Sequence, residues 1–167
     1  LTSRFSLVVE ILYEADAWAR MEDSEYVKVE HVEKAIKGKI YRNSKYEEKL
    51  NDLYEDGTLL MDVTGETVGQ INGLVVMGTG EHSFGKPTRI TVSTYRGKAG
   101  IINIEREVAK SGPIHSKGVY VLSGYLGGKY AQEHPISLTA SISFEQNYSM
   151  IDGDSASSTE LYGILSS

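Results

Sequence analysis

The residues best suited to chemistry lie near the end of the chain, in the stretch Ile-Asp-Gly-Asp-Ser-Ala-Ser-Ser at positions 151–158. Ser155 follows a glycine turn and directly precedes a predicted helix over 156–165. A serine at such a junction lies near unpaired backbone N–H groups and the positive end of the helix dipole. These groups can stabilise the oxyanion that forms when serine attacks a carbonyl. The pattern therefore indicates a candidate nucleophile at Ser155.

The same residues also suit a purely structural role. Aspartate and serine just before an apolar run are typical of an ordinary helix N-cap. A serine nucleophile additionally needs a base, because its hydroxyl is weakly nucleophilic unaided. The chain ends 12 residues after Ser155 (167 − 155) without supplying one. Taken alone, the local sequence favours the helix cap over the nucleophile.

Metal-binding patterns are absent from the sequence. An EF-hand loop that began at Asp152 would need glycine at position 157 and glutamate at position 163, where the chain has Ser157 and Gly163. The chain has no cysteine, which excludes disulfides, thiol catalysis and cysteine metal sites. The histidines lack metal-ligand spacing, so surface or hydrogen-bonded roles are expected for them. They are His31, His82, His115 and His134.

The segment Gly-Glu-His-Ser-Phe-Gly-Lys at positions 80–86 matches most of a phosphate-binding P-loop. That loop needs a hydroxyl after its lysine to hold Mg²⁺, and a helix that starts at the phosphates. Here Pro87 follows the lysine, and the next segment has the pattern of a strand. The segment is therefore predicted to be a surface hairpin loop. The segment leaves one alternative function open, that of a small-molecule kinase. A measurement of nucleotide binding would decide between the two interpretations.

Helices are predicted for the first fifty-odd residues. Apolar residues recur at steps of three and four from Phe5 to about Met21, which gives one apolar face. A second helix is predicted from near Val29 to about Tyr54, with Gly38 as a weak interruption.

From Gly57 onward, short apolar runs alternate with glycine, a pattern typical of strands. Residues 117–128 are ambiguous and fit a helix somewhat better than a strand. The change near Gly57 is the best domain boundary. The predicted strands are 59–63, 68–77, 89–95, 100–104 and 136–144, with a loop over 78–87 and a helical turn over 105–110.

Composition bounds the class of protein. The chain has 167 residues, 40% of them hydrophobic and 24% charged, which is normal for a globular domain with a sizeable core. The net charge is 17 − 23 = −6, which argues against nucleic acid as the main partner. No apolar run is long enough to span a membrane. The chain starts with Leu1 and shows no signal peptide, so we expect it to be cut from a longer protein at both ends.

Several motifs occur together in the second half of the chain. They are Gly-Gln-Ile-Asn-Gly-Leu at 69–74, Ser-Gly-Pro-Ile-His-Ser-Lys-Gly-Val at 111–119, Leu-Ser-Gly-Tyr-Leu at 122–126 and Gly-Asp-Ser-Ala-Ser at 153–157. In this order and spacing, the motifs resemble the proteolytic domain of the Lon family, from about Met61 to Ser167. The LonB-type branch is the most similar, because its nucleophile lies in a Gly-Asp-Ser-Ala-Ser context. In the first part of the chain, two segments resemble the two packing helices of an AAA+ lid, residues 12–18 and 30–36.

The resemblance implies roles for particular residues. It makes Ser155 the catalytic serine, paired with a lysine on a later segment. A partly desolvated lysine has a lowered pKa and can act as general base. That lysine is expected beyond the end of this chain, since neither Lys117 nor Lys129 stands in the matching position. Asp152 is expected to contact the dyad, and the backbone N–H of Asp154 to contribute to the oxyanion site.

The resemblance also implies an α+β fold, with a helical lid-like segment over 1–56 and a proteolytic domain over 57–167 that is incomplete at its C-terminus. The complete protein is expected to be an ATP-dependent serine endopeptidase that degrades protein or peptide substrates, with this fragment inactive. ATP and Mg²⁺ are expected in an upstream ATPase domain and no cofactor in this fragment. A homohexamer and a cytoplasmic location are expected. The alternative is a non-cleaving assembly or regulatory module of a Lon-like protein.

Overall fold

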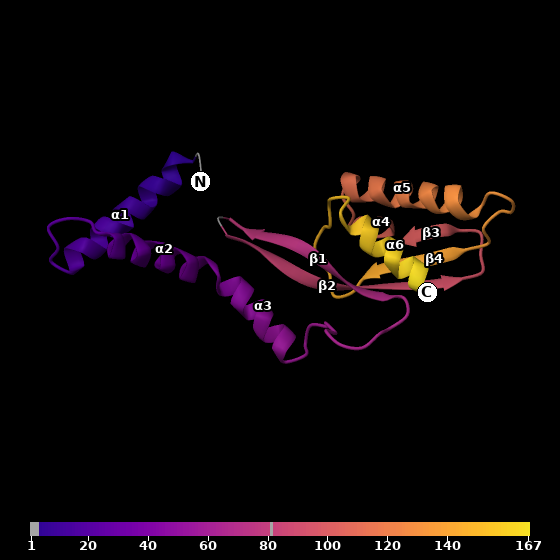
Figure 1. Cartoon of the computed structure of the whole chain (residues 1–167), viewed down its shortest axis with the longest axis horizontal. Coiled ribbons are helices and arrows are strands. Elements are labelled where there is room, and N and C mark those ends of the chain that lie inside the picture. Colours follow the sequence, from indigo (N-terminus) through magenta and orange to yellow (C-terminus); the bar gives the residue numbers. More distant parts are fainter. Residues whose placement is uncertain (1–3, 81) are drawn as a thin grey trace. The chain divides into compact units, whose positions relative to one another are not determined.

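The chain divides into two units, each of which is described by itself. The structure is a computed structural model that describes residues 4–80 and 82–167 (Figure 1). The helical unit contains the chain up to Asp52, together with Gly78–Phe84. The sheet unit contains Leu53–Met77 and Gly85–Ser167.

The helical unit is built on the pair α1 (Phe5–Met21) and α2 (Val29–Asn43). Ala15 and Ala19 of α1 and Ala35 of α2 are buried, and such small side chains let two helices approach closely. The helix predicted from 29 to 54 is instead two helices, because α2 ends at Asn43 and α3 spans Lys45–Glu55. Gly38 lies inside α2 and does not interrupt it.

The break between α2 and α3 lies at Ser44. The Ser44 hydroxyl donates to Glu48 Oε1 at 2.7 Å or to the backbone oxygen of Tyr41, which lies 3.4 Å away. Serine side chains that bond to nearby backbone compete with the regular helical pattern, which gives a physical reason for the break.

A polar cluster joins the end of α1 to α2. The Lys34 ammonium donates to Glu22 and holds the pKa of that carboxyl below its ordinary value. His31 is buried, and its Nε2 lies 3.3 Å from Glu22 Oε2 while its Nδ1 accepts from the Lys28 N–H at 3.0 Å. His31 is therefore a hydrogen-bonded histidine of the helix pair, as expected from the sequence.

A four-stranded mixed sheet forms the frame of the sheet unit, and its strands follow the order β1-β2-β4-β3. Strands β2 and β4 are antiparallel, with Ile90 opposite Phe144, whereas β3 and β4 are parallel. Strand β1 therefore lies at one edge of the sheet and β3 at the other. The strands are β1 (Gln70–Thr79), β2 (His82–Tyr95), β3 (Gly100–Asn103) and β4 (Thr139–Phe144).

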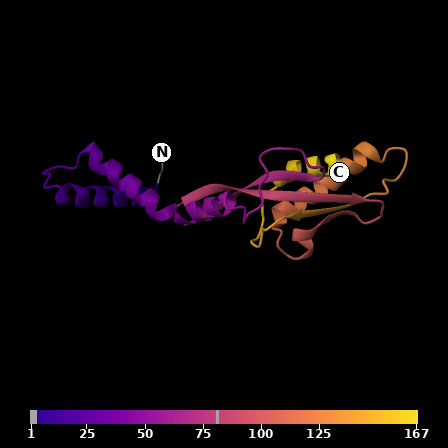
Figure 2. The same ribbon diagram turned by 90° about the horizontal axis from the view of Figure 1, so that it is seen from below.

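The core of the sheet unit lies between the sheet and two helices, α5 (Pro113–Tyr130) and α6 (Ala156–Ser166), which contact each other (Figures 1 and 2). A short helix, α4 (Ile104–Glu107), follows β3. Alternating residues of β2 and β4 share one face of the sheet, as the strand period requires. The core residues are Ile90, Val92, Leu122, Leu126, Ala140, Ile142, Phe144, Ile151 and Ile164.

The α+β class predicted from the sequence is confirmed, but several segments differ from their predictions. Residues 59–63 form no strand, because the Leu59 N–H bonds to Leu53 O and the Leu60 N–H to the side chain of Gln146. The loop predicted over 78–87 is also wrong, since β2 already begins at His82. The ambiguous segment 117–128 is helix, within α5.

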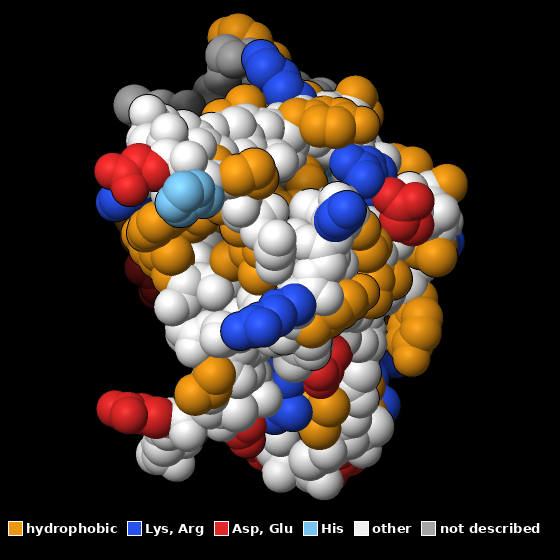
Figure 3. Space-filling view, turned by 90° about the vertical axis from the view of Figure 1, so that its right-hand side faces the viewer, with side chains coloured by type: hydrophobic (Ala, Val, Ile, Leu, Met, Phe, Trp, Pro, Cys, Tyr) orange, Lys and Arg blue, Asp and Glu red, His pale blue; other side chains and the backbone are white. Residues whose placement is uncertain are grey.

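No helix in the described residues is both long and apolar enough to cross a membrane. On the face shown in Figure 3, single acidic and basic side chains are scattered among hydrophobic ones, without a broad field of one charge sign.

Candidate active site

Ser155 lies directly before α6, in the N-cap position, with helical backbone angles (φ −61°, ψ −28°). Its side chain is exposed and makes no capping hydrogen bond to the helix. The helix-cap role that the local sequence favours is therefore not the role of this hydroxyl. The first N–H groups of a helix have no intrahelical partners, so Ser155 stands beside donors and at the positive end of the helix dipole.

An open groove in the sheet unit, the Ser155 groove, has a volume of about 500 Å³. The edge strand β1 and the start of α6 lie along it, and its lining is mostly apolar. No lysine of the described residues is among those that line it. The lining residues are Gly73, Leu74, Val75, Val76, Ile90, Phe144, Met150, Ile151, Asp152, Ser155, Ala156 and Thr159.

A tight turn brings the chain from the Ser155 groove into α6. Gly153 has φ +98°, a left-handed conformation that favours glycine over residues with a side chain. Its N–H donates to Asp152 Oδ1 at 2.9 Å. The glycine of the Gly-Asp-Ser motif is thus required by the backbone geometry that precedes Ser155.

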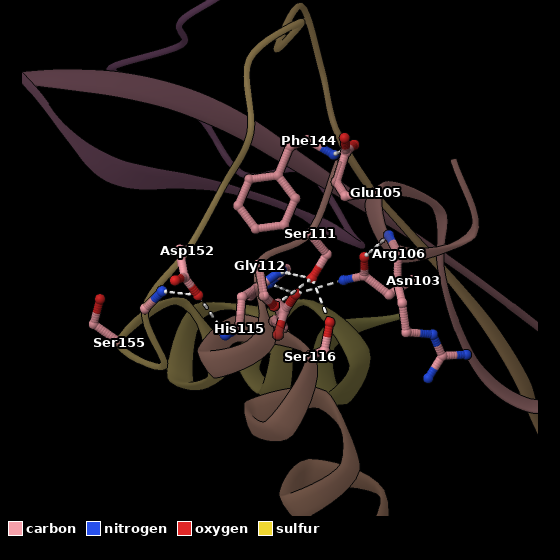
Figure 4. A network of polar contacts seen from close by, with 12 residues as sticks. Asn103, Glu105, Arg106, Ser111, Gly112, His115, Ser116, Phe144, Asp152 and Ser155 are labelled. Atoms are coloured by element: carbon pink, nitrogen blue, oxygen red, sulfur yellow. Dashed lines mark hydrogen bonds and ion pairs between the residues drawn. The ribbon is translucent and has the colours of Figure 1, made fainter. Parts of the chain in front are cut away.

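Asp152 caps α5, not the helix that follows it in sequence. Its Oδ1 accepts hydrogen bonds from the N–H groups of Ile114 at 3.0 Å and His115 at 3.1 Å, in the first turn of α5 (Figure 4). The N-cap of α5 is Gly112, which has no side chain of its own to accept such bonds. A Cβ on Gly112 would lie only 2.4 Å from Asp152 Cγ, so the glycine also leaves room for the carboxylate.

The hydrogen bonds at Asp152 change its acidity. Donation from the Gly153 N–H, and then from the His115 N–H, holds the pKa of the Asp152 carboxyl below its ordinary value. Asp152 therefore remains an anion down to lower pH than a free aspartate, and its charge faces the positive end of α5. Through this contact the turn that carries Ser155 is fastened to α5.

Asp154 lies on the same turn but lines a different cavity. This second cavity, about 330 Å³, lies between α5 and α6 and is also lined by Lys117, Ser157 and Ser158. Asp152 and Ser155 thus share one groove, whereas Asp154 lines another. The backbone oxygen of Asp154 accepts from the Ser157 N–H at 3.1 Å, which begins the helical pattern of α6.

A buried polar network lies behind the turn, centred on His115 (Figure 4). His115 Nε2 donates to Glu160 Oε1 at 3.0 Å, and both side chains are fully buried. His115 Nδ1 lies 2.8 Å from the Ser111 hydroxyl, and Asn103 Nδ2 donates to the same Glu160 oxygen at 2.8 Å. This network joins α5 and α6 with polar contacts, because His115 lies on α5 and Glu160 on α6, the helix that Ser155 precedes.

Sequence reasoning missed both the cap on α5 and the buried network. The possible helix in the sequence began only at residue 117, although Gly-Pro at 112–113 is a common start for a helix, with proline in the first turn. A helix that starts with glycine needs its cap from elsewhere, and Asp152 supplies it. No local sequence pattern could identify Glu160 as part of this network, because its partners lie 45 and 57 residues away.

Comparison with known proteins places the chain among Lon relatives. Residues 1–42 match the family model described as "Archaeal LonB, AAA+ ATPase LID domain". A protein of Escherichia coli (strain K12) named "Putative Lon protease homolog" is 32% identical over 158 residues, which cover 93% of this chain. A protein of the same name from Haemophilus influenzae (strain ATCC 51907 / DSM 11121 / KW20 / Rd) is 40% identical over 100 residues, 58% of this chain.

This chain is related to the Lon family. The resemblance inferred from the motifs is confirmed, and the lid match coincides with α1 and nearly all of α2. The chain spans about a quarter of the length of its Lon relative from Escherichia coli (27%) and less of that from Haemophilus influenzae (16%).

Proposed function

We propose that this chain carries the nucleophile of a Lon-like serine endopeptidase and that Ser155 is that nucleophile. The observation that supports this best is the exposed Ser155 hydroxyl, which makes no capping bond and stands beside the first N–H groups of α6 at an open groove. These are the surroundings that a serine needs in order to attack a carbonyl.

The proposed reaction is acyl transfer. The Ser155 Oγ attacks the carbonyl carbon of the scissile peptide while a lysine takes the hydroxyl proton, and the carbonyl oxygen becomes an oxyanion. The oxyanion collapses, the C–N bond breaks, and the amine leaves with the proton that the lysine had taken. Water then hydrolyses the acyl ester on Ser155, which frees the second product and restores the hydroxyl. N–H groups at the start of α6, with that of Asp154 as a further candidate, donate to this oxyanion. The base is a lysine outside the described residues, in a Ser-Lys dyad. Asp152 acts in this proposal mainly by holding the turn, with its contact to the dyad as a second role.

The substrate is proposed to bind as an extended strand. Strand β1 is at the edge of the sheet and lines the Ser155 groove, so its outer backbone groups are placed to pair with a peptide. Leu74 and Val76 are 73% and 76% exposed, which leaves apolar side chains for contact with the substrate. Protein or peptide substrates are therefore the substrate class that suits this groove.

The complete protein is proposed to couple this site to ATP. The lid match supports an AAA+ module, in which ATP and Mg²⁺ would be bound by residues outside this chain. A homohexameric ring that encloses the sites, and a cytoplasmic location, complete the proposal by analogy with the family.

The decisive experiment replaces Ser155 by alanine in the full-length protein. We expect Ser155→Ala to lower peptide hydrolysis by at least about 10³-fold, because the nucleophile is lost, with ATP hydrolysis and unfolding temperature retained. Ser158→Ala is the matched control, since Ser158 is also exposed and on the first turns of α6. Unchanged peptide hydrolysis by Ser155→Ala would refute the proposal.

A non-cleaving assembly or regulatory module is the second candidate. The observation in its favour is that no lysine of the described residues lines the Ser155 groove. It predicts that the full-length protein assembles and hydrolyses ATP but shows no peptide hydrolysis that depends on Ser155. The same Ser155→Ala comparison therefore separates the two candidates.

A further inference from the structure

His115 makes hydrogen bonds through its backbone N–H and both of its ring nitrogens. Two of the partners lie on opposite sides of Ser155 in the sequence. The backbone N–H of His115 donates to Asp152 Oδ1, and its ring Nε2 donates to Glu160 Oε1. Asp152 precedes Ser155 by three positions and Glu160 follows it by five. His115 therefore contacts a residue on each side of the candidate nucleophile.

We propose that His115 is a positioning residue for Ser155: it fixes both ends of the segment that presents the hydroxyl, together with Glu160 and Asp152. This inference rests on the proposed function, in which Ser155 is the nucleophile. His115 itself is fully buried and does not line the Ser155 groove, so it acts through these residues and not on the substrate.

The contact on the N-terminal side fixes the turn. Asp152 Oδ1 accepts from two N–H groups of α5 and from that of Gly153, so the carboxylate is held from both directions. Only Gly153 and Asp154 lie between this anchor and Ser155. A short connection of this kind leaves the serine little freedom of position once Asp152 is fastened.

The contact on the C-terminal side fixes α6. Glu160 is fully buried, and its hydrogen bonds all reach Oε1, from His115 and Asn103, while no bond to Oε2 exists in the described structure. A buried carboxylate that loses a donor is strongly destabilised, so it moves toward a new donor or water. Loss of the His115 ring would therefore shift α6 and, with it, Ser155 at its start.

His115 also supports a wall of the Ser155 groove. Its ring packs edge-on against Phe144, with ring centroids 5.5 Å apart, and Phe144 lines the groove. One side chain thus touches the helix of the nucleophile and the groove that receives the peptide. Displacements of about 1 Å at a reacting group can cost about 10²-fold in rate, so these contacts have kinetic consequences.

The test uses the full-length protein and a fluorogenic peptide substrate, with kcat and KM measured separately. His115→Ala should lower kcat by about 10²-fold, with KM changed by less than about threefold, because binding to β1 persists while Ser155 is misplaced. His115→Gln restores a donor toward Glu160 and should regain at least about tenfold of kcat. Glu160→Ala should resemble His115→Ala, since it breaks the same contact from the other side.

Leu126→Ala provides the control for lost stability alone. Leu126 is buried in the same core on α5, but it has no part in the polar contacts to Asp152 or Glu160. This variant should lose stability yet keep kcat per folded molecule. If His115→Ala and Leu126→Ala have the same kcat per folded molecule, His115 is structural only and the inference is overturned.

Two further outcomes remain distinguishable. If His115→Ala does not fold, His115→Leu and Glu160→Leu decide by the same comparison, because each keeps a side chain of similar size but removes the donor or the acceptor of the contact. Wild-type kcat per folded molecule in both variants would overturn the inference. Loss of hydrolysis in Ser155→Ala with normal kcat in the His115 variants removes only the positioning role. Full hydrolysis in Ser155→Ala removes the proposed function itself.

Discussion

The role of Ser155 depends on its neighbours more than on its own type. The acidic turn does contain a helix cap, but the capping group is Asp152 and the capped helix is α5. The Ser155 hydroxyl, which the local sequence assigns to capping, makes no such bond. The local sequence around the turn contains only the helix that follows it. The helix that Asp152 caps begins 39 positions earlier (152 − 113).

The hydrogen bonds of Asp152 give a prediction at the scale of single residues. The Gly153 N–H, followed by the His115 N–H, lowers the pKa of this carboxyl in the folded protein. A lowered folded pKa stabilises the native state at pH values above the unfolded pKa, about 3.9, and that contribution disappears as the pH falls through the folded pKa. We therefore expect Asp152→Asn to be less stable than the wild type above about pH 5, with the difference shrinking toward zero in more acidic buffer.

The measurement is urea unfolding of both proteins over a series of pH values. Asp154→Asn controls for the loss of one negative charge on the same turn, since Asp154 accepts none of the α5 amide bonds. A stability difference between wild type and Asp152→Asn that stays constant from pH 7 to acid would contradict the assigned role.

At the scale of elements, local patterns predicted most helices and strands, and long-range contacts explain the exceptions. The apolar periods of α1 and α6 coincide with the observed helices almost to the residue. Residues 59–63 have the composition of a strand, but their backbone is bonded to Leu53 and to Gln146, 86 positions away from Leu60. No local pattern includes Gln146. The strand predicted over 59–63 is therefore absent because tertiary contacts override the local preference.

Close packing of α6 on the sheet gives the second prediction. Gly163 is buried in α6, and a Cβ at this position would lie 2.6 Å from Val92 Cγ2 of β2. Valine is stiff and Val92 is itself in the core, so it cannot easily move aside. Gly163→Ala should destabilise the protein by about 1–3 kcal/mol from overpacking, although alanine is the better helix former by about 1 kcal/mol.

Gly124→Ala is the matched control for helix propensity. Gly124 is exposed within α5, and nothing lies within 4 Å of a Cβ built there. This change should stabilise the protein by about 0.5–1 kcal/mol in the same urea unfolding experiment. Equal and stabilising effects of the two substitutions would show that α6 does not pack on β2 through Gly163.

At the scale of the whole molecule, the order of motifs predicted the family, while the geometry of the site needed the folded chain. Gly-Asp-Ser-Ala-Ser and Ser-Gly-Pro-Ile-His stand about forty residues apart, and spacing alone suggested that they belong to one domain. That Asp152, which directly precedes the first motif, caps the helix begun by the second became apparent only in the structure. Contacts between distant motifs depend on tertiary packing, which a single sequence does not contain.

The last prediction concerns the 167-residue chain as a molecule. A serine becomes an efficient nucleophile only with a base within hydrogen-bond reach. The described residues that line the Ser155 groove include neither lysine nor histidine, and His115 is occupied by Ser111 and Glu160 in the core. The purified chain should therefore fold but show no peptide hydrolysis above the rate of its own Ser155→Ala variant.

The measurement compares the chain and that variant on a fluorogenic peptide, with the full-length protein as the positive control and intact mass to verify the length of the chain. The comparison with Ser155→Ala removes any contribution from contaminating proteases. Hydrolysis by the 167-residue chain that disappears in Ser155→Ala would mean that a group within these residues activates the serine. In that case the proposed division of the dyad, with the serine in this chain and its lysine outside it, would be wrong.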